Sequence, residues 1–145
     1  MEVKLRKLFT AILVIILVIS ASSYVLAVER GSPTQVVVYY FHGTARCPTC
    51  HKLEQYSKEA LENNFKDALA SGKLEFRVVN VDNKGNEHYT NDYQLYTKSL
   101  ILSLVKDGKQ IKWINLDKIW EYVGNKQKFI DYVKAGVADL LKEVK

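Results

Sequence analysis

The sequence predicts an α/β domain with a four-stranded mixed sheet and helices on both faces. Three observations support this prediction: the apolar, β-branched and aromatic run Gln35–Phe41, the helical spacing of residues after Cys47, and the Asp107-Gly108 turn between two later strand-like runs. A run that is apolar almost throughout is typical of a strand buried on both faces, as at the centre of a sheet. With 145 residues, the chain has room for one such domain.

The predicted elements follow the order strand, helix, strand, short helix, hairpin and helix. The first helix follows Cys47, because apolar residues between Leu53 and Leu69 recur at helical spacing, and it ends at Ser71-Gly72. The later elements are predicted at Leu74–Val81 (strand), Glu87–Leu95 (short helix), Leu100–Val105 and Gln110–Ile114 (hairpin strands), and Asp117–Val123 and Lys126–Val144 (helix, interrupted at Gly124-Asn125). A long helical crossover makes the first two strands parallel, whereas the tight Asp-Gly turn makes the hairpin strands antiparallel.

Several aromatic residues are predicted to pack in the core. Tyr89, Tyr93 and Tyr96 recur at helical spacing, while Trp113 and Trp120 lie in the predicted hairpin and the final helical region. For each of them we expect a packing role rather than a binding platform for a substrate.

Residues 1–28 are predicted to be a membrane segment rather than part of the fold. A basic stretch precedes Leu8–Val28, which is 21 residues long and carries no charge. A run of about 17–25 apolar residues crosses a bilayer, and its basic flank stays in the cytoplasm. We therefore expect a single-pass protein of the cell membrane, with a linker at 29–34 and a domain at 35–145 outside the cytoplasm.

A cleaved signal peptide is the alternative interpretation of the same segment. Val25-Leu26-Ala27 resembles a small-residue cleavage site, and cleavage near Ala27 would give a secreted protein. Under both interpretations the domain works outside the cytoplasm.

Charge and composition argue against a nucleic-acid partner. The formal net charge of +5 is mild, and no basic run is interleaved with aromatic residues. A nucleic-acid-binding surface usually shows such a basic patch in the sequence, so we expect no nucleic-acid binding.

Cys47 and Cys50 are the only cysteines of the chain, and they lie three residues apart. A disulfide between them closes almost no loop, so a purely structural bridge would add little stability. The pair follows a buried strand and opens a helix, with Pro48 suited to its first turn. The N–H groups of a helix N-terminus, together with the charge of Arg46, lower the pKa of a cysteine and favour a thiolate at Cys47. Cys50, one turn further on, is placed to resolve a mixed disulfide.

From residue 35 onward the sequence resembles the thioredoxin superfamily. The resemblance rests on the strand before Cys47-Pro48-Thr49-Cys50, a second strand ending at Asp82, the hairpin at Lys106–Lys109 and a final helix. Within that superfamily, Val38–Cys50 looks like a small group of exported thioredoxin-like proteins. The resemblance implies a thioredoxin-like three-layer sandwich and a redox-active Cys47–Cys50 disulfide, with Cys47 as nucleophile and Cys50 as resolving thiol. We expect no cofactor beyond this disulfide.

Three positions depart from the family pattern. Arg46 stands where many members carry tryptophan. No carboxylate lies between Gln35 and Cys50 to match the family's buried aspartate, so His42, Glu54 or a water would have to move the proton. The family's cis-proline is also missing, because the matching stretch is Thr97-Lys98-Ser99-Leu100. That proline presents backbone to a peptide substrate and crowds out metals, so its loss weakens the case for general protein substrates and strengthens the case for a bound metal.

Two other interpretations of the cysteine pair stay open. The first is c-type haem attachment, because Cys47-Pro48-Thr49-Cys50-His51 matches C-x-x-C-H, with His51 as proximal ligand and His42 or His88 as distal ligand. The second is metal binding, in which the two cysteines with His42 and His51 hold zinc, or the two thiols alone hold copper(I) or a metalloid such as arsenic.

The predicted function is thiol–disulfide exchange by the Cys47/Cys50 dithiol–disulfide couple, with metal or metalloid binding as the main alternative. The expected partners are protein or small-molecule thiols and disulfides. An exported reductase would also need a membrane electron-transfer partner, because the sequence contains no electron donor of its own. The dipeptide between the cysteines does not fix the direction of electron flow.

Overall fold

The computed structural model describes residues 34–144. The predicted membrane segment, Leu8–Val28, and residues 29–33 of the predicted linker lie outside this range. Within residues 34–144, no helix combines the length and the apolar character that a membrane crossing requires. The elements in chain order are β1 (Gln35–His42), α2 (Pro48–Asn64), α3 (Lys66–Ala70), β2 (Leu74–Asn80), α4 (His88–Asp92), β3 (Ser99–Lys106), β4 (Lys109–Asn115), α5 (Ile119–Tyr122) and α6 (Lys126–Leu141).

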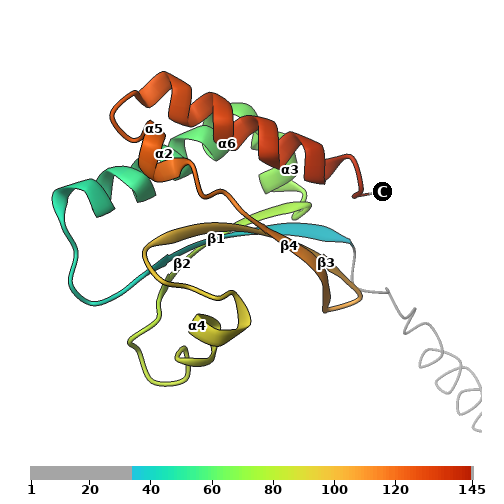
Figure 1. Cartoon of the computed structure of the whole chain (residues 1–145). Helices are drawn as coiled ribbons and strands as arrows, with labels where there is room; N and C mark the ends of the chain where they lie inside the picture. The colour runs from blue at the N-terminus through green and yellow to red at the C-terminus, as the bar shows by residue number, and fades with distance from the viewer. Residues whose placement is uncertain (1–33, 145) are drawn as a thin grey trace, which may run out of the picture. The chain divides into compact units, whose positions relative to one another are not determined.

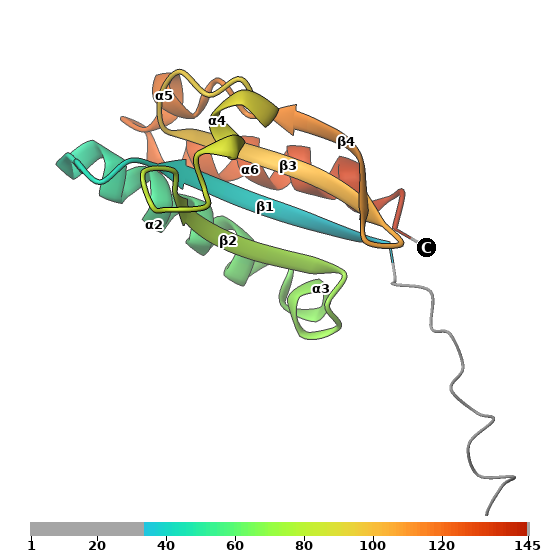
Figure 2. The same cartoon turned by 90° about the horizontal axis from the view of Figure 1, so that it is seen from below.

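The four strands form one mixed sheet in the order β2-β1-β3-β4 (Figure 2). β1 is parallel to β2 and antiparallel to β3, and β4 is antiparallel to β3. Val38, at the centre of β1, lies opposite Phe76 of β2 on one side and Leu102 of β3 on the other. This order and these directions confirm the predicted thioredoxin-like sheet, with β1 as an interior strand.

Helices cover both faces of the sheet, which confirms the predicted three layers (Figure 1). Of the helices within residues 34–144, α2, α3, α5 and α6 lie on the first face and α4 lies on the second. Side chains of β1 alternate between the faces, as strand geometry requires. Val36, Val38 and Tyr40 belong to the core on the first face, and Val37, Tyr39 and Phe41 belong to the core on the second. Because both sides of β1 are buried, the run Gln35–Phe41 is apolar almost throughout.

Aromatic rings fill the second face, where α4 is only five residues long. The ring of Tyr93 lies 5.2 Å from that of Phe41 and 5.5 Å from that of Trp113, measured between ring centres. Tyr89 adds a ring 5.1 Å from Phe41. Large rings of this kind bury much area per residue, so a short helix is enough to cover this face. The predicted packing roles of Tyr89, Tyr93 and Trp113 are confirmed.

The predicted packing roles of Tyr96 and Trp120 are wrong, since these side chains are 95% and 38% exposed. α4 ends at Asp92, and Gln94 takes a left-handed backbone conformation with φ of 51°. The chain therefore turns before Tyr96, and the helical spacing that placed this residue in the core stops too early. Trp120 lies on α5 and donates its ring N–H to the carbonyl oxygen of Lys98 at 2.9 Å.

The predicted first helix is divided into two in the structure. α2 ends at Asn64 because Phe65 leaves helical geometry, with φ of −136° and ψ of 36°, and α3 starts immediately after it. The ring of Phe65 packs against the core on the first face of the sheet, which is the larger of the two cores. Asn64 Nδ2 donates to the carbonyl oxygen of Ala60 at 2.8 Å, within the last turn of α2.

The larger core predicts a clear contrast between two aromatic residues. Phe129 of α6 is fully buried and contacts the ring of Tyr56 on α2, whereas Tyr96 is 95% exposed. We expect Phe129→Ala to lower the free energy of unfolding by about 3–5 kcal/mol, because it leaves a cavity between α2, α6 and the sheet. Tyr96→Ala should change it by less than about 0.5 kcal/mol. Urea unfolding of the oxidised protein measures both, and equal effects would contradict the described core.

Candidate active site

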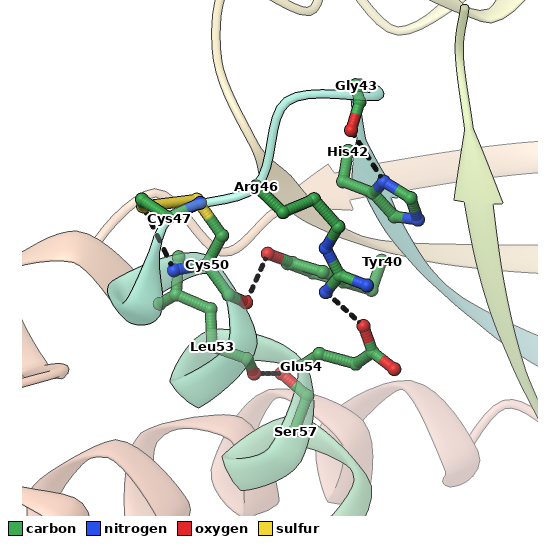
Figure 3. Close-up of polar contacts among 9 residues, drawn as sticks. All are labelled: Tyr40, His42, Gly43, Arg46, Cys47, Cys50, Leu53, Glu54 and Ser57. Carbon is green, nitrogen blue, oxygen red and sulfur yellow. Dashed lines mark hydrogen bonds and ion pairs between the residues drawn. A yellow bond between two sulfur atoms is a disulfide. The ribbon is translucent and has the colours of Figure 1, made fainter.

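Cys47 and Cys50 form a disulfide at the N-terminus of α2 (Figure 3). Cys47 is the N-cap residue, with an extended backbone (φ −91°, ψ 164°), and Pro48 begins the helix. Cys47 Sγ accepts the backbone N–H of Cys50 at 3.2 Å, and Cys50 Sγ accepts that of Cys47 at 3.2 Å. The N–H groups and the positive end of the helix dipole therefore act on the Cys47 sulfur, as the sequence predicts.

The two cysteines differ in their access to solvent. Cys47 is exposed, whereas Cys50 is 1% exposed. The difference follows from helix geometry, because Cys50 and the buried Leu53 lie on the side of α2 that faces the core, and Cys47 lies at the tip. A partner molecule can therefore approach Cys47, whereas Cys50 is shielded from solvent.

A buried hydroxyl group lies beneath the second cysteine. Tyr40 of β1 is 0% exposed, and its Oη donates to the carbonyl oxygen of Cys50 at 2.7 Å (Figure 3). Burial raises the pKa of Tyr40 to about 12, so the phenol keeps its proton and acts as a donor. Tyr40 is missing from the predicted site residues. The available signal was a polar atom inside an apolar strand, since a buried tyrosine hydroxyl needs a partner.

Arg46 points toward Glu54 rather than toward the disulfide (Figure 3). Its guanidinium forms an ion pair with Glu54 of α2 and lies 6.0 Å from the centre of the Tyr40 ring. The side chains of Arg46 and Glu54 are 21% and 30% exposed, so solvent screens the pair only in part. Glu54 therefore compensates part of the Arg46 charge in the fold, and the predicted effect of Arg46 on the Cys47 thiolate stays a prediction.

His42 is half-buried at the end of β1, and its Nδ1 donates to the carbonyl oxygen of Gly43 at 2.9 Å. Its ring centre lies 6.0 Å from that of Tyr40. Among the described residues, no hydrogen bond joins His42 to either cysteine. The structure therefore adds no support for the predicted role of His42 in proton transfer, which stays a prediction.

The loop between β1 and Cys47 is fixed by the segment that follows β2. Asp82 Oδ2 accepts the backbone N–H of Thr44 at 2.6 Å, and Asn80 Nδ2 donates to Thr44 Oγ1 at 3.2 Å. The Thr44 N–H lowers the pKa of Asp82. A Cβ atom at Gly43 would lie 3.0 Å from Asp82 Oδ2, so this close approach favours glycine. Sequence spacing does not reveal the contact between Thr44 and Asp82, because these residues are 38 positions apart in the chain.

The residues named above as possible zinc ligands do not form a cluster in the part of the chain that the structure describes. Across residues 34–144, no three His, Cys, Asp or Glu side chains gather as metal ligands would. His51 is exposed on α2, while His42 bonds to Gly43. The sulfurs of Cys47 and Cys50 are joined to each other in this structure, and haem attachment through the reduced thiols stays a prediction to be tested.

The stretch that matches the family's cis-proline begins β3. Ser99 lies opposite Phe41 of β1, and the peptide bonds of the stretch are trans. Ser99 Oγ donates to the carbonyl oxygen of Thr97 at 3.0 Å, and Trp120 donates to that of Lys98. Side-chain hydrogen bonds thus fix this backbone, where the family uses a proline.

A pocket of about 280 Å³ lies between this stretch and the end of β1. Phe41, His42, Asp82, Thr97 and Lys98 are among its lining residues, and neither cysteine lines it. The pocket neighbours the loop that leads to the disulfide without reaching the reactive sulfur.

The strand order and the disulfide at the start of α2 define a thioredoxin-like domain with a CXXC cysteine pair. No protein-family model and no curated protein sequence matches the chain. Among solved structures it is similar to Fasciola hepatica thioredoxin (TM-score 0.36, 21% identity, 63% of this chain and 81% of that chain). It is also similar to a cysteine-to-serine variant of Entamoeba histolytica thioredoxin (TM-score 0.41, 19% identity, 72% of this chain and 84% of that chain). A third similar structure is Trypanosoma brucei brucei thioredoxin (TM-score 0.37, 21% identity, 72% of this chain and 80% of that chain). The fold assignment rests on the topology of this chain.

The Arg46–Glu54 ion pair predicts opposite effects of its two partners on the reduced site. Arg46→Ala leaves the Glu54 carboxylate uncompensated and should raise the pH midpoint for alkylation of Cys47 by iodoacetamide. Glu54→Gln leaves the guanidinium uncompensated and should lower it. Each shift should be about 0.2–0.7 pH unit, because charges near a protein surface usually interact by about 0.2–1 kcal/mol and one pKa unit corresponds to about 1.4 kcal/mol. Glu62→Gln, which breaks the Lys58 pair farther along α2, is the control and should change nothing. Shifts in the same direction for Arg46 and Glu54 would contradict the electrostatic explanation.

Proposed function

We propose that this protein is a thiol–disulfide oxidoreductase that uses the Cys47–Cys50 couple outside the cytoplasm. One observation carries the proposal: an exposed sulfur and a buried sulfur share a disulfide at the N-terminus of a helix. A disulfide stabilises a fold mainly by closing a long loop, whereas this one joins residues three apart. Its geometry suits exchange with a partner better than it suits stabilisation.

In the reducing direction, the Cys47 thiolate attacks one sulfur of a substrate disulfide. The substrate S–S bond breaks, a disulfide between Cys47 and the substrate forms, and the departing thiolate takes a proton from water. Cys50 then loses its proton and attacks the Cys47 sulfur, which releases the second substrate thiol. Two electrons pass from the dithiol to the substrate, and in the oxidising direction the same steps run backwards.

The proposal includes a membrane tether through Leu8–Val28 and partners that are protein or small-molecule thiols and disulfides. The uncharged length of this segment and its basic flank support the tether. A tethered reductase would take its electrons from a membrane partner, since the chain holds two cysteines and no second redox pair. A tethered oxidase would return its electrons to such a partner.

Binding of a metal or metalloid by the reduced cysteines is the second candidate function. It is favoured by the absence of proline from Thr97–Leu100, because the family's proline crowds metals out of the site. Two thiolates are soft ligands and suit copper(I) or arsenic(III). This candidate uses the same two residues, so a partner-trapping experiment separates it from the redox enzyme.

The unequal exposure of the two cysteines predicts unequal behaviour of their serine variants. Cys50→Ser should accumulate mixed disulfides with partners, because the attacked complex has lost its resolving thiol. Cys47→Ser should trap little and abolish reduction of a disulfide substrate. Non-reducing gels of protein isolated with its thiols blocked would show the trapped species.

Three outcomes would favour other functions. Equal, slow labelling of both cysteines without trapping would favour a structural pair. Stoichiometric binding of copper(I) or arsenite without trapping would favour the metal-binding candidate. A haem mass on the cysteines, lost in His51→Ala, would favour haem attachment.

The membrane tether predicts on which side of the membrane the domain lies and that the chain stays in the membrane fraction. A reporter enzyme fused after Lys145 should be active only outside the cytoplasm, and the chain should resist carbonate extraction from membranes. The physical reason is that 21 uncharged residues behind a basic flank insert with the N-terminus inside. A soluble mature form that begins near Val28 would replace the anchor with a signal peptide.

A further inference from the structure

Tyr40 connects the most enclosed strand of the sheet to the cysteine turn of α2. It pairs with Val78 of β2 on one side and with Leu100 of β3 on the other, so its backbone is held from both sides. Its side chain lies in the larger core and is 0% exposed. The Tyr40 side chain therefore has a fixed position, and a hydrogen bond from it can hold the first turn of α2 in place.

The Tyr40 hydroxyl adds a second hydrogen bond to the carbonyl oxygen of Cys50. In a regular helix this carbonyl accepts the backbone N–H of Glu54, four residues on. Tyr40 Oη donates to the same oxygen at 2.7 Å from the sheet side. The peptide of the buried cysteine is therefore tied to the helix and to the central strand together.

The Arg46–Glu54 ion pair covers this contact from the outside. Arg46 precedes the helix and Glu54 lies on its second turn, so the pair spans the cysteine turn, with the guanidinium 6.0 Å from the Tyr40 ring centre. Burial raises the pKa of Tyr40 to about 12 although the nearby Arg46 lowers it, so the phenol stays protonated across the pH range in which thiols titrate. The hydroxyl can therefore donate in the reduced and the oxidised protein alike.

We propose that Tyr40 is a positioning residue for the thiol–disulfide step: its hydroxyl holds the Cys50 peptide so that the Cys50 sulfur stays within reach of Cys47 after the disulfide opens. This inference rests on the proposed function. Once the disulfide is open, the first turn of α2 loses its covalent tie, and first turns of helices have unpaired N–H groups and fray. The Tyr40 bond favours the ordered turn, and the ordered turn is the one in which Cys50 can attack the Cys47 sulfur.

The test compares Tyr40→Phe with Tyr56→Phe in the purified full-length chain equilibrated with glutathione redox buffers. Tyr56 lies on the same helix, packs against Phe129, and its hydroxyl makes no hydrogen bond among the described residues. Tyr40→Phe should lower the effective concentration of Cys50 toward Cys47 by about three- to tenfold, the usual worth of one hydrogen bond. The reduction potential should then become less negative by about 14–30 mV, at 29.6 mV per tenfold. Tyr56→Phe should leave it unchanged.

A measurement on the wild-type protein keeps the proposal testable if Tyr40→Phe does not fold. If Tyr40 holds the turn, amide hydrogen exchange in residues 47–54 should speed up little on reduction. Strong acceleration, or a Tyr40→Phe variant with wild-type potential and lower stability, would make Tyr40 a purely structural residue. Glutathione equilibration needs no biological partner, so absence of trapped partners in Cys50→Ser would count against the proposed function and leave the Tyr40 result standing.

Discussion

The burial of β1 on both faces is the constraint on which the rest of the structure depends. An interior strand with two covered faces sends alternate side chains into two cores. Val36, Val38 and Tyr40 hold the helical layer that contains α2, and Val37, Tyr39 and Phe41 hold the aromatic layer around α4. Because α2 packs on the same strand that leads into the disulfide loop, the start of the helix has a fixed position relative to the end of the strand. The chemistry of the site follows from that fixed position.

The helix N-terminus provides positive potential at the Cys47 sulfur. The Cys47 sulfur accepts the Cys50 N–H at 3.2 Å, and it lies where the unpaired N–H groups of α2 begin. Arg46 is adjacent in sequence, and Glu54 compensates part of its charge. A partly compensated cation contributes less to the potential at a neighbouring sulfur than a free one. The Arg46–Glu54 pair joins the residue before Cys47 to the second turn of α2.

The fold and the two cysteines could be predicted from the sequence because both depend on local patterns. Gln35–Phe41, the spacing after Cys47 and the Asp107-Gly108 turn each specify an element without knowledge of its neighbours. The contacts of Tyr40 with Cys50 and of Thr44 with Asp82 depend on how elements pack, and no residue spacing encodes them. Tyr96 shows where helical spacing misleads. The spacing of Tyr89, Tyr93 and Tyr96 predicts a helix through Tyr96, but the chain leaves the helix before it, with Gln94 in a left-handed conformation.

The two backbone segments that flank the site are held by the same kind of contact. Tyr40 donates to the carbonyl oxygen of Cys50 at the start of α2, and Trp120 donates to that of Lys98 before β3. Each bond joins a side chain of one element to a backbone carbonyl of another, and so ties two elements together next to the site. A chain without proline at Thr97–Leu100 needs another means to order this stretch, and the Trp120 bond supplies it from α5. Two aromatic donors, Tyr40 and Trp120, therefore hold the backbone on the two sides of the site.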